Sequence, residues 1–150
     1  MNMMIKNFPE ELQLLRSLCQ THQLRLDLSD DRRALLVGQG FAISITVDRE
    51  GVRYWYVDAA KPPILTQYAL DFYVVRKRKA TSDSNPVFSN NSDRVRYELR
   101  QACYDLEEYA VDVLAGNRNW TKDYEFGTTN PEGDYRNGVL ETIWQNEPSH

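Results

Sequence analysis

The feature that most constrains the fold is a run of strict alternation over residues 41–48. Successive side chains of a strand point to opposite faces, so this pattern predicts a strand with one buried face. Arg49-Glu50-Gly51 reads as a turn into a second strand over residues 52–57, which predicts a hairpin. The alternating residues are Phe41, Ile43, Ile45 and Val47 on one face, and Ala42, Ser44, Thr46 and Asp48 on the other.

Three further segments are expected to be strands. Leucines alternate with polar residues over residues 24–28, and an apolar run covers residues 34–37 before Gly38-Gln39-Gly40. After Lys61-Pro62-Pro63, a longer strand is predicted from alternation at Tyr68, Leu70, Phe72 and Val74. Only short turns join these segments, and parallel strands need long crossovers, so the sequence predicts an antiparallel meander of about five strands.

Two helices are predicted from apolar residues at three- and four-residue spacing. The first begins near Pro9 with Asn7 as its cap, and its stripe is Phe8, Leu12, Leu15, Leu18, Cys19 and His22. The second runs from about residue 93 to residue 115, with Ser92 or Asp93 as cap and Gly116 at its end. Its stripe is Val95, Leu99, Ala102, Leu106, Ala110 and Val113. We therefore expect an α+β fold with an N-terminal helix and a long C-terminal helix packed on the sheet.

Length and composition favour one domain over residues 1–150, because a chain of this size supports a single core. Residues 127–150 are rich in turn-forming residues and are expected to form an extended or partly ordered tail. The start of the chain lacks a signal-peptide pattern, and no run approaches the roughly 18 apolar residues of a membrane span. We expect a cytoplasmic protein without membrane contact, with Cys19 and Cys103 as buried free thiols.

The residues that usually carry catalysis or bind metals are scarce. Cys19 and His22 share a helical face, but nothing else completes a four-ligand metal site. A Cys103–His22 pair is conceivable, although a cysteine within a core stripe is more often inert. Gly38-Gln39-Gly40 leads into a strand, so it is not a phosphate loop before a helix. We expect no cofactor, no metal and no enzymatic activity.

Charge is distributed unevenly. Residues 1–104 hold 15 basic and 12 acidic side chains, whereas residues 105–150 hold three basic and ten acidic ones. Residues 101–117 contain no Lys or Arg. Asp105, Glu108 and Asp112 have the spacing of one helix face, which suits a solvated face, a carboxylate site or a binding face. Such an acidic region repels nucleic acid and membranes and attracts a basic protein.

Aromatic side chains accompany these carboxylates, as in many protein interfaces. The alternative is that the rings fill the space between helix and sheet. The run Arg76-Lys77-Arg78-Lys79 is expected at a strand end, either to protect a sheet edge or to bind nucleic acid; the net charge of −4 favours the former. The predicted partner-binding residues are Asp105, Glu107, Glu108, Tyr109, Asp112, Trp120 and Tyr124.

The layout over roughly residues 8–126 resembles that of small bacterial immunity proteins. The resemblance lies in a short helix, a meander, and an acidic helix that ends Leu114-Ala115-Gly116-Asn117 before Trp120. It implies a non-catalytic inhibitor that binds and occludes a basic toxin. An acidic secretion chaperone is the main alternative, and a dimer with an apolar groove would favour it. A small nucleic-acid-binding protein and a carboxylate-dependent enzyme are further alternatives.

Overall fold

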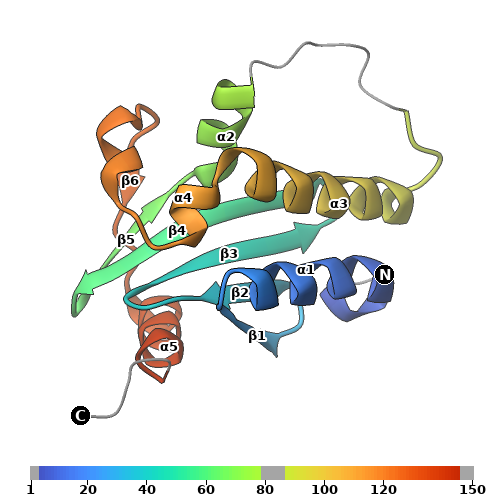
Figure 1. The fold of residues 1–150 in the computed structure, drawn as a ribbon. Helices are drawn as coiled ribbons and strands as arrows, with labels where there is room; N and C mark the ends of the chain where they lie inside the picture. Colours follow the sequence, from blue (N-terminus) through green and yellow to red (C-terminus); the bar gives the residue numbers. More distant parts are fainter. Residues whose placement is uncertain (1–3, 79–86, 146–150) are drawn as a thin grey trace.

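The computed structural model describes residues 4–78 and 87–145. At its centre is an antiparallel sheet in which each strand pairs with the next along the chain (Figure 1). This confirms the predicted meander. The sheet has a sixth strand of two residues that the sequence did not indicate. The strands are β1 (Arg25–Asp30), β2 (Arg33–Val37), β3 (Phe41–Asp48), β4 (Gly51–Lys61), β5 (Ile64–Tyr68) and β6 (Thr128–Thr129).

Aspartate side chains stabilise the ends of β1 and β3 and the irregularity near the end of β4. Asp30, Asp48 and Asp58 each accept a hydrogen bond from the backbone N–H two residues further on, at 2.7–2.9 Å. The short carboxylate of Asp reaches its own backbone at this spacing, which favours turns. The β3–β4 hairpin expected from the alternation pairs from Phe41↔Asp58 to Asp48↔Gly51.

Two helices, α1 (Pro9–Thr21) and α3 (Asn91–Tyr109), lie side by side across one face of the sheet (Figure 1). Their predicted apolar stripes lie in the same buried cluster as the odd-numbered side chains of β3, which confirms both stripes except for His22, a residue outside this cluster. A buried carboxylate joins the two helices. Glu11 is 1% exposed and accepts a hydrogen bond from Nε of Arg100 at 2.6 Å, with Nε of Arg96 at 3.7 Å.

The helix ends differ in detail from the prediction. Asn7 lies in the 3₁₀ turn η1 (Ile5–Asn7), and Phe8 stands at the cap position of α1 without a side-chain hydrogen bond. Asn90 caps α3, because its side chain accepts from the N–H of Asp93 at 2.8 Å. The expected single helix to residue 115 is interrupted at Ala110, whose φ is −130°; α4 (Val111–Leu114) continues beyond it.

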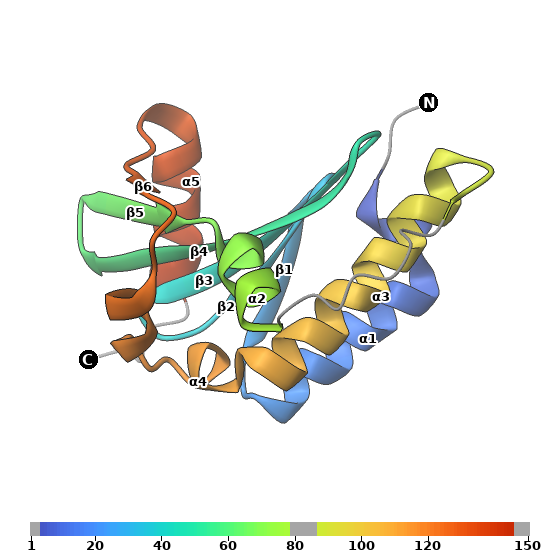
Figure 2. The same cartoon turned by 90° about the horizontal axis from the view of Figure 1, so that it is seen from above.

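The segment after β5 is a helix, α2 (Leu70–Arg78), which corrects the longer strand predicted there. Leu70, Tyr73 and Val74 are its buried apolar residues, at helical spacing. Because β5 is shorter than β4, α2 packs against β4 beyond the end of β5, as Figure 2 shows. Asp71 there accepts from the N–H of Tyr54 at 3.4 Å and forms a hydrogen-bonded salt bridge with Arg53.

The opposite face of the sheet is covered by α5 (Gly133–Trp144), which lies on the other side from α1 and α3 (Figure 2). Residues 133–144 are therefore helical, and the extended tail expected from residue 127 is wrong for this segment. Val139, Leu140 and Ile143 make a second, smaller core with the sheet. Its sheet members are Leu35, Val37, Ala42, Val57, Ala59 and Leu65. No helix within residues 4–78 and 87–145 is long and apolar enough to cross a membrane.

Candidate protein-binding surface

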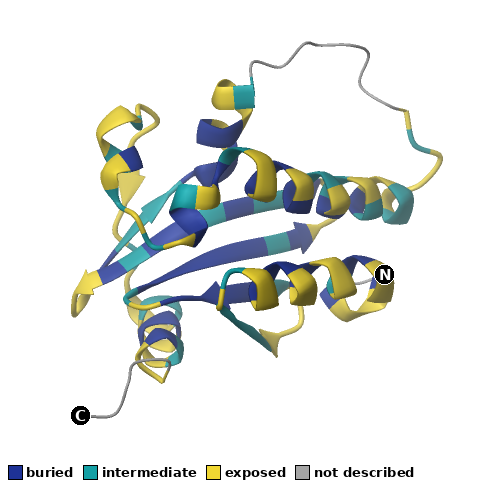
Figure 3. Ribbon diagram, viewed as in Figure 1, coloured by how far each residue is buried: buried dark blue, intermediate teal, exposed yellow. Residues whose placement is uncertain are grey.

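The outward side of α3 and α4 is coloured as exposed in Figure 3. Several of the exposed residues there are large and apolar or aromatic. Tyr97 and Tyr104 are seven residues apart on α3, which places them along one side of that helix, and Val111 is the first residue of α4, beyond the interruption at Ala110. They are 41%, 66% and 47% exposed, and Tyr104 is the most open of the three. Glu108 lies between Tyr104 and Val111 and is also exposed. We call Tyr97, Tyr104, Glu108 and Val111 the α3–α4 stripe.

The charges beside this stripe change sign along the helix. Near its start, three arginines are matched by carboxylates: Arg94 with Glu98, Arg96 with Asp93, and Arg100 with Glu10 and Glu11. Further along the helix, Nε2 of His22 lies 2.9 Å from Oε2 of Glu107, within hydrogen-bond distance. Glu108 and Asp112 form no salt bridge within the described parts of the chain. The second half of the stripe is therefore its acidic half.

Two of the predicted partner-binding residues are buried, and they cannot contact a partner in this fold. Asp105 is 5% exposed; its carboxylate accepts from Arg78 at 2.7 Å and from Gln101 at 3.0 Å. Asp105 consequently faces α2 instead of sharing an open face with Glu108 and Asp112. Trp120 is 2% exposed and packs edge-on against Tyr56 at 5.1 Å. The alternative that such rings fill the core is correct for Trp120.

Two tyrosines of the predicted set serve the fold as well. Tyr109 is half-buried against the large core, and its backbone carbonyl accepts from Nζ of Lys77 at 3.0 Å. The hydroxyl of Tyr124 accepts from the N–H of Ala69 at 2.9 Å and donates to the carbonyl of Gly127 at 2.6 Å. Tyr124 therefore ties the segment before β6 to the chain that joins β5 and α2. Glu107, Glu108 and Asp112 remain as surface residues of the predicted set.

The basic run ends α2 and not a strand, and its described members contact the acidic C-terminal region. Arg76 pairs with Glu125 at 2.9 Å and donates to the carbonyl of Asp123 at 2.7 Å. As described above, Lys77 bonds to Tyr109 and Arg78 to Asp105. Cations and carboxylates that are distant in sequence thus neutralise each other here. Lys79 lies outside the described residues.

The acidic residues of the C-terminal third do not form one patch. Glu132, Asp134 and Glu141 belong to the start or the body of α5, on the far face of the sheet from α3 (Figure 2). The excess charge seen in the sequence is consequently split between two sides of the molecule. The part beside the stripe is reduced to Glu107, Glu108 and Asp112.

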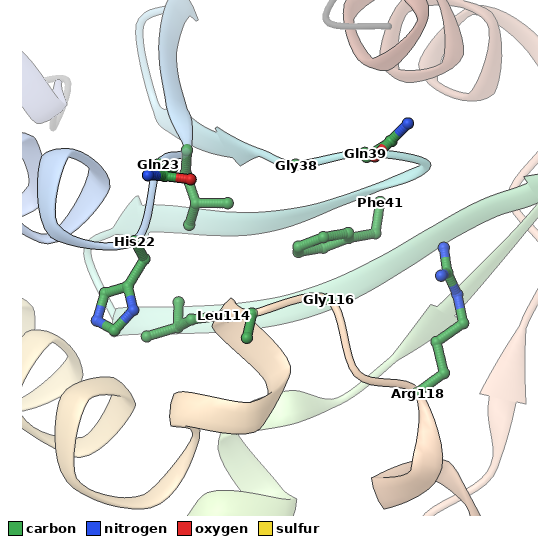
Figure 4. A pocket seen from close by; sticks show the side chains of 10 residues that line it. His22, Gln23, Gly38, Gln39, Phe41, Leu114, Gly116 and Arg118 are labelled. Carbon is green, nitrogen blue, oxygen red and sulfur yellow. The ribbon is translucent and has the colours of Figure 1, made fainter.

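A pocket of about 440 Å³ opens where the loops after α1, β2 and α4 meet (Figure 4). Phe41 lies between Gly38 and Gly116, and a Cβ at Gly38 would collide with its ring. Two of the polar side chains that line the pocket are engaged by the protein itself. His22 pairs with Glu107, and Arg118 bonds to Asp58 at 3.2 Å and to the carbonyl of Gly40 at 3.1 Å.

The candidates for nucleophilic or metal chemistry are likewise used by the fold. Burial raises the pKa of the Cys103 thiol to about 12 and that of Cys19 to about 11, so both are protonated at neutral pH. His22 bonds to Glu107, not to Cys103, in the described structure. No group of three His, Cys, Asp or Glu side chains among the described residues is arranged to hold a metal ion.

The predicted partner-binding set omitted Val111, and it omitted Tyr104 although its ring is one of the aromatics beside the carboxylates. The signal was the seven-residue spacing from Tyr97 to Tyr104 to Val111, all three outside the predicted apolar stripe of the same helix. Large residues that a core stripe excludes are candidates for contact with something else.

The comparisons with known proteins complete the description of this surface. No protein-family model matches the sequence, no curated protein is similar to it, and no solved structure matches the fold.

Proposed function

We propose that this chain is a non-catalytic binding domain that uses the acidic half of the α3–α4 stripe to dock on a basic protein. The observation that carries the proposal is Tyr104. Its ring is 66% exposed in a stretch, residues 101–117, that contains no Lys or Arg. A solvent-facing aromatic side chain next to carboxylates that form no salt bridge with a described residue has the composition of a binding hot spot with a charged rim.

The physical roles of the residues would differ. Tyr104 and Val111 would provide the apolar area buried at the centre of the contact. Glu107, Glu108 and Asp112 would attract cationic groups during the encounter and fix the orientation of the partner. Glu108 and Asp112 suit this role because no salt bridge with another described residue has to be broken first.

In its specific form, we propose an inhibitor of the immunity type in the bacterial cytoplasm, which blocks the active site of a basic toxin by covering it. Support comes from the layout of the fold, an antiparallel meander with α1 and α3 on one face, and from the acidic surface of α3 and α4. Steric occlusion requires no catalytic group. It is therefore compatible with buried, protonated thiols and with a histidine engaged by Glu107.

The test is binding of the basic protein encoded beside this chain, measured by calorimetry together with inhibition of that protein's activity. Glu108→Lys combined with Asp112→Lys should weaken binding at least about tenfold, or ~1.4 kcal/mol, because two attractions become repulsions. Tyr104→Ala should weaken it by a similar or larger factor.

The matched control is Glu50→Lys combined with Glu141→Lys. It makes the same change in net charge at two exposed positions away from the stripe. If control and test variants lose affinity equally, only net charge matters and the assignment of the surface is wrong. Unchanged affinity in the Glu108/Asp112 variant would also refute it. A chaperone, in contrast, would bind an unfolded segment of the partner and leave the folded partner active.

A further inference from the structure

A second exposed aromatic surface lies on α2 and the chain before β6. Phe72 and Val75 are 48% and 41% exposed and lie one turn apart on α2. Phe126, 42% exposed, packs edge-on against Phe72 with ring centroids 5.8 Å apart. We call Phe72, Val75 and Phe126, together with the flanking Trp55, Arg53 and Arg76, the α2 patch.

Two arginines are stacked into this patch. The guanidinium of Arg53 lies between the rings of Trp55 and Phe72, 4.3 Å and 4.5 Å from their centroids. That of Arg76 lies 5.5 Å from the centroid of Phe126. Arginine stacked on aromatic rings extends their flat surface and keeps its edge for hydrogen bonds. The patch is therefore a continuous aromatic and guanidinium surface.

The charges of this patch are balanced within the chain. Arg53 is paired with Asp71 through two hydrogen bonds, and Arg76 is paired with Glu125 at 2.9 Å. Each stacked cation thus has a carboxylate of its own. The α2 patch differs in this respect from the acidic half of the α3–α4 stripe, where Glu108 has no salt bridge among the described residues.

Charge balance determines what can cover each surface. In a two-fold symmetric dimer, a patch meets a copy of itself, so a patch with net charge repels its own copy. The acidic half of the α3–α4 stripe would do so, whereas the α2 patch would not. Homodimer interfaces are also more apolar than other surfaces and rich in aromatic residues and Arg, the composition of the α2 patch.

We propose that the α2 patch is the interface between two copies of this chain. Phe72, Val75 and Phe126 of each copy would form its centre, and Arg53 and Arg76 its rim. Such a dimer would bury the patch and so provide no apolar groove for an unfolded client. The α2 patch and the α3–α4 stripe have no residue in common, so this proposal does not depend on the proposed function.

The experiment is sedimentation equilibrium of the full chain over a wide concentration range. Because a standard interface needs about 800 Å² from each partner and this apolar centre is small, we expect a dissociation constant in the micromolar range. Phe72→Glu combined with Phe126→Glu should raise that constant at least about 100-fold by placing uncompensated charges at the centre. Val75→Glu is the second variant, in case the double variant does not fold by circular dichroism.

The matched control is Tyr104→Glu, which makes the same kind of change at the more exposed aromatic residue of the other surface. We expect it to dimerise like the unaltered chain. A chain that stays monomeric up to about 200 μM would overturn the proposal, as would a patch variant that still dimerises. A Tyr104→Glu variant that loses the dimer would also overturn it, because the interface would then include the α3–α4 stripe.

Discussion

The two faces of the sheet are buried to different extents and by different means. One face packs against α1, α2, α3, α4 and Trp120 and contributes to a cluster of 25 buried residues among those described. Within the described residues, the other packs against α5 and forms a cluster of nine. The large core joins elements from Ile5 to Trp120, so damage there should affect most of the fold. The small core joins α5 to a sheet whose strands already pair with one another, so a destabilising change there should mainly affect α5.

The largest effect that separates the two faces is expected from Trp120→Ala. The ring contacts Tyr56, Tyr68 and Tyr73 with centroids 5.0–5.3 Å apart. Its Nε1 has no hydrogen-bond partner among the described residues, so the expected cost comes from lost packing and not from a lost hydrogen bond. Truncating a buried Trp costs about 3–5 kcal/mol, to which the lost aromatic pairs add. We expect the free energy of unfolding in urea to fall by about 4 kcal/mol.

The control for this variant is Trp144→Ala, at the end of α5, where the ring is 49% exposed. It should change the free energy of unfolding by less than about 1 kcal/mol. A loss below about 1.5 kcal/mol in Trp120→Ala would contradict the central role of this ring in the large core.

A smaller and more local effect is expected from Ile143→Ala in the small core. Ile143 is fully buried. Replacing a buried Ile by Ala lowers the free energy of unfolding by about 2–5 kcal/mol, and we expect a value at the lower end because the small core contains few residues. Hydrogen exchange should show faster exchange in α5 with little change in α1 and α3. Ile64→Ala, at a residue 54% exposed on β5, is the control. Equal acceleration in α3 and α5 would mean that the two cores unfold as one unit.

The same contrast explains how much of the fold the sequence predicted. The alternation from Phe41 to Val47 has one reading, because only a strand buries every second residue. The run from Tyr68 to Val74 has two: Leu70, Tyr73 and Val74 also fit one helix face. The contact of Asp71 with the edge of β4, which favours the helix, depends on tertiary structure.

The sequence did not predict the helix α5, because Gly133 and Gly138 are typical of turns and its fully buried apolar residues number only three. A signal was nevertheless present in the sheet. The continuous apolar run at residues 34–37 is typical of a strand covered on both faces, which implies a second layer. For the candidate surface, the sequence placed the carboxylates on the correct helix. It did not reveal that Asp105 and Trp120 are buried, since their partners Arg78 and Tyr56 are distant in the chain.

The smallest of these effects per residue is the alkaline sensitivity that the buried thiols give to the large core. Both described thiols lie there, and burial raises the pKa of Cys19 to about 11 and that of Cys103 to about 12 from 9.0. The folded chain therefore keeps protons that the unfolded chain releases, so stability falls as the pH rises above about 9. We expect a loss of about 1 kcal/mol per thiol by about pH 9.7, measured by urea unfolding. Cys19→Ala combined with Cys103→Ala should flatten this decline. Ile143→Ala should lower the free energy of unfolding equally at every pH and leave its slope against pH unchanged. A slope that the cysteine changes do not alter would show that other groups, such as the buried Tyr54, determine the alkaline sensitivity.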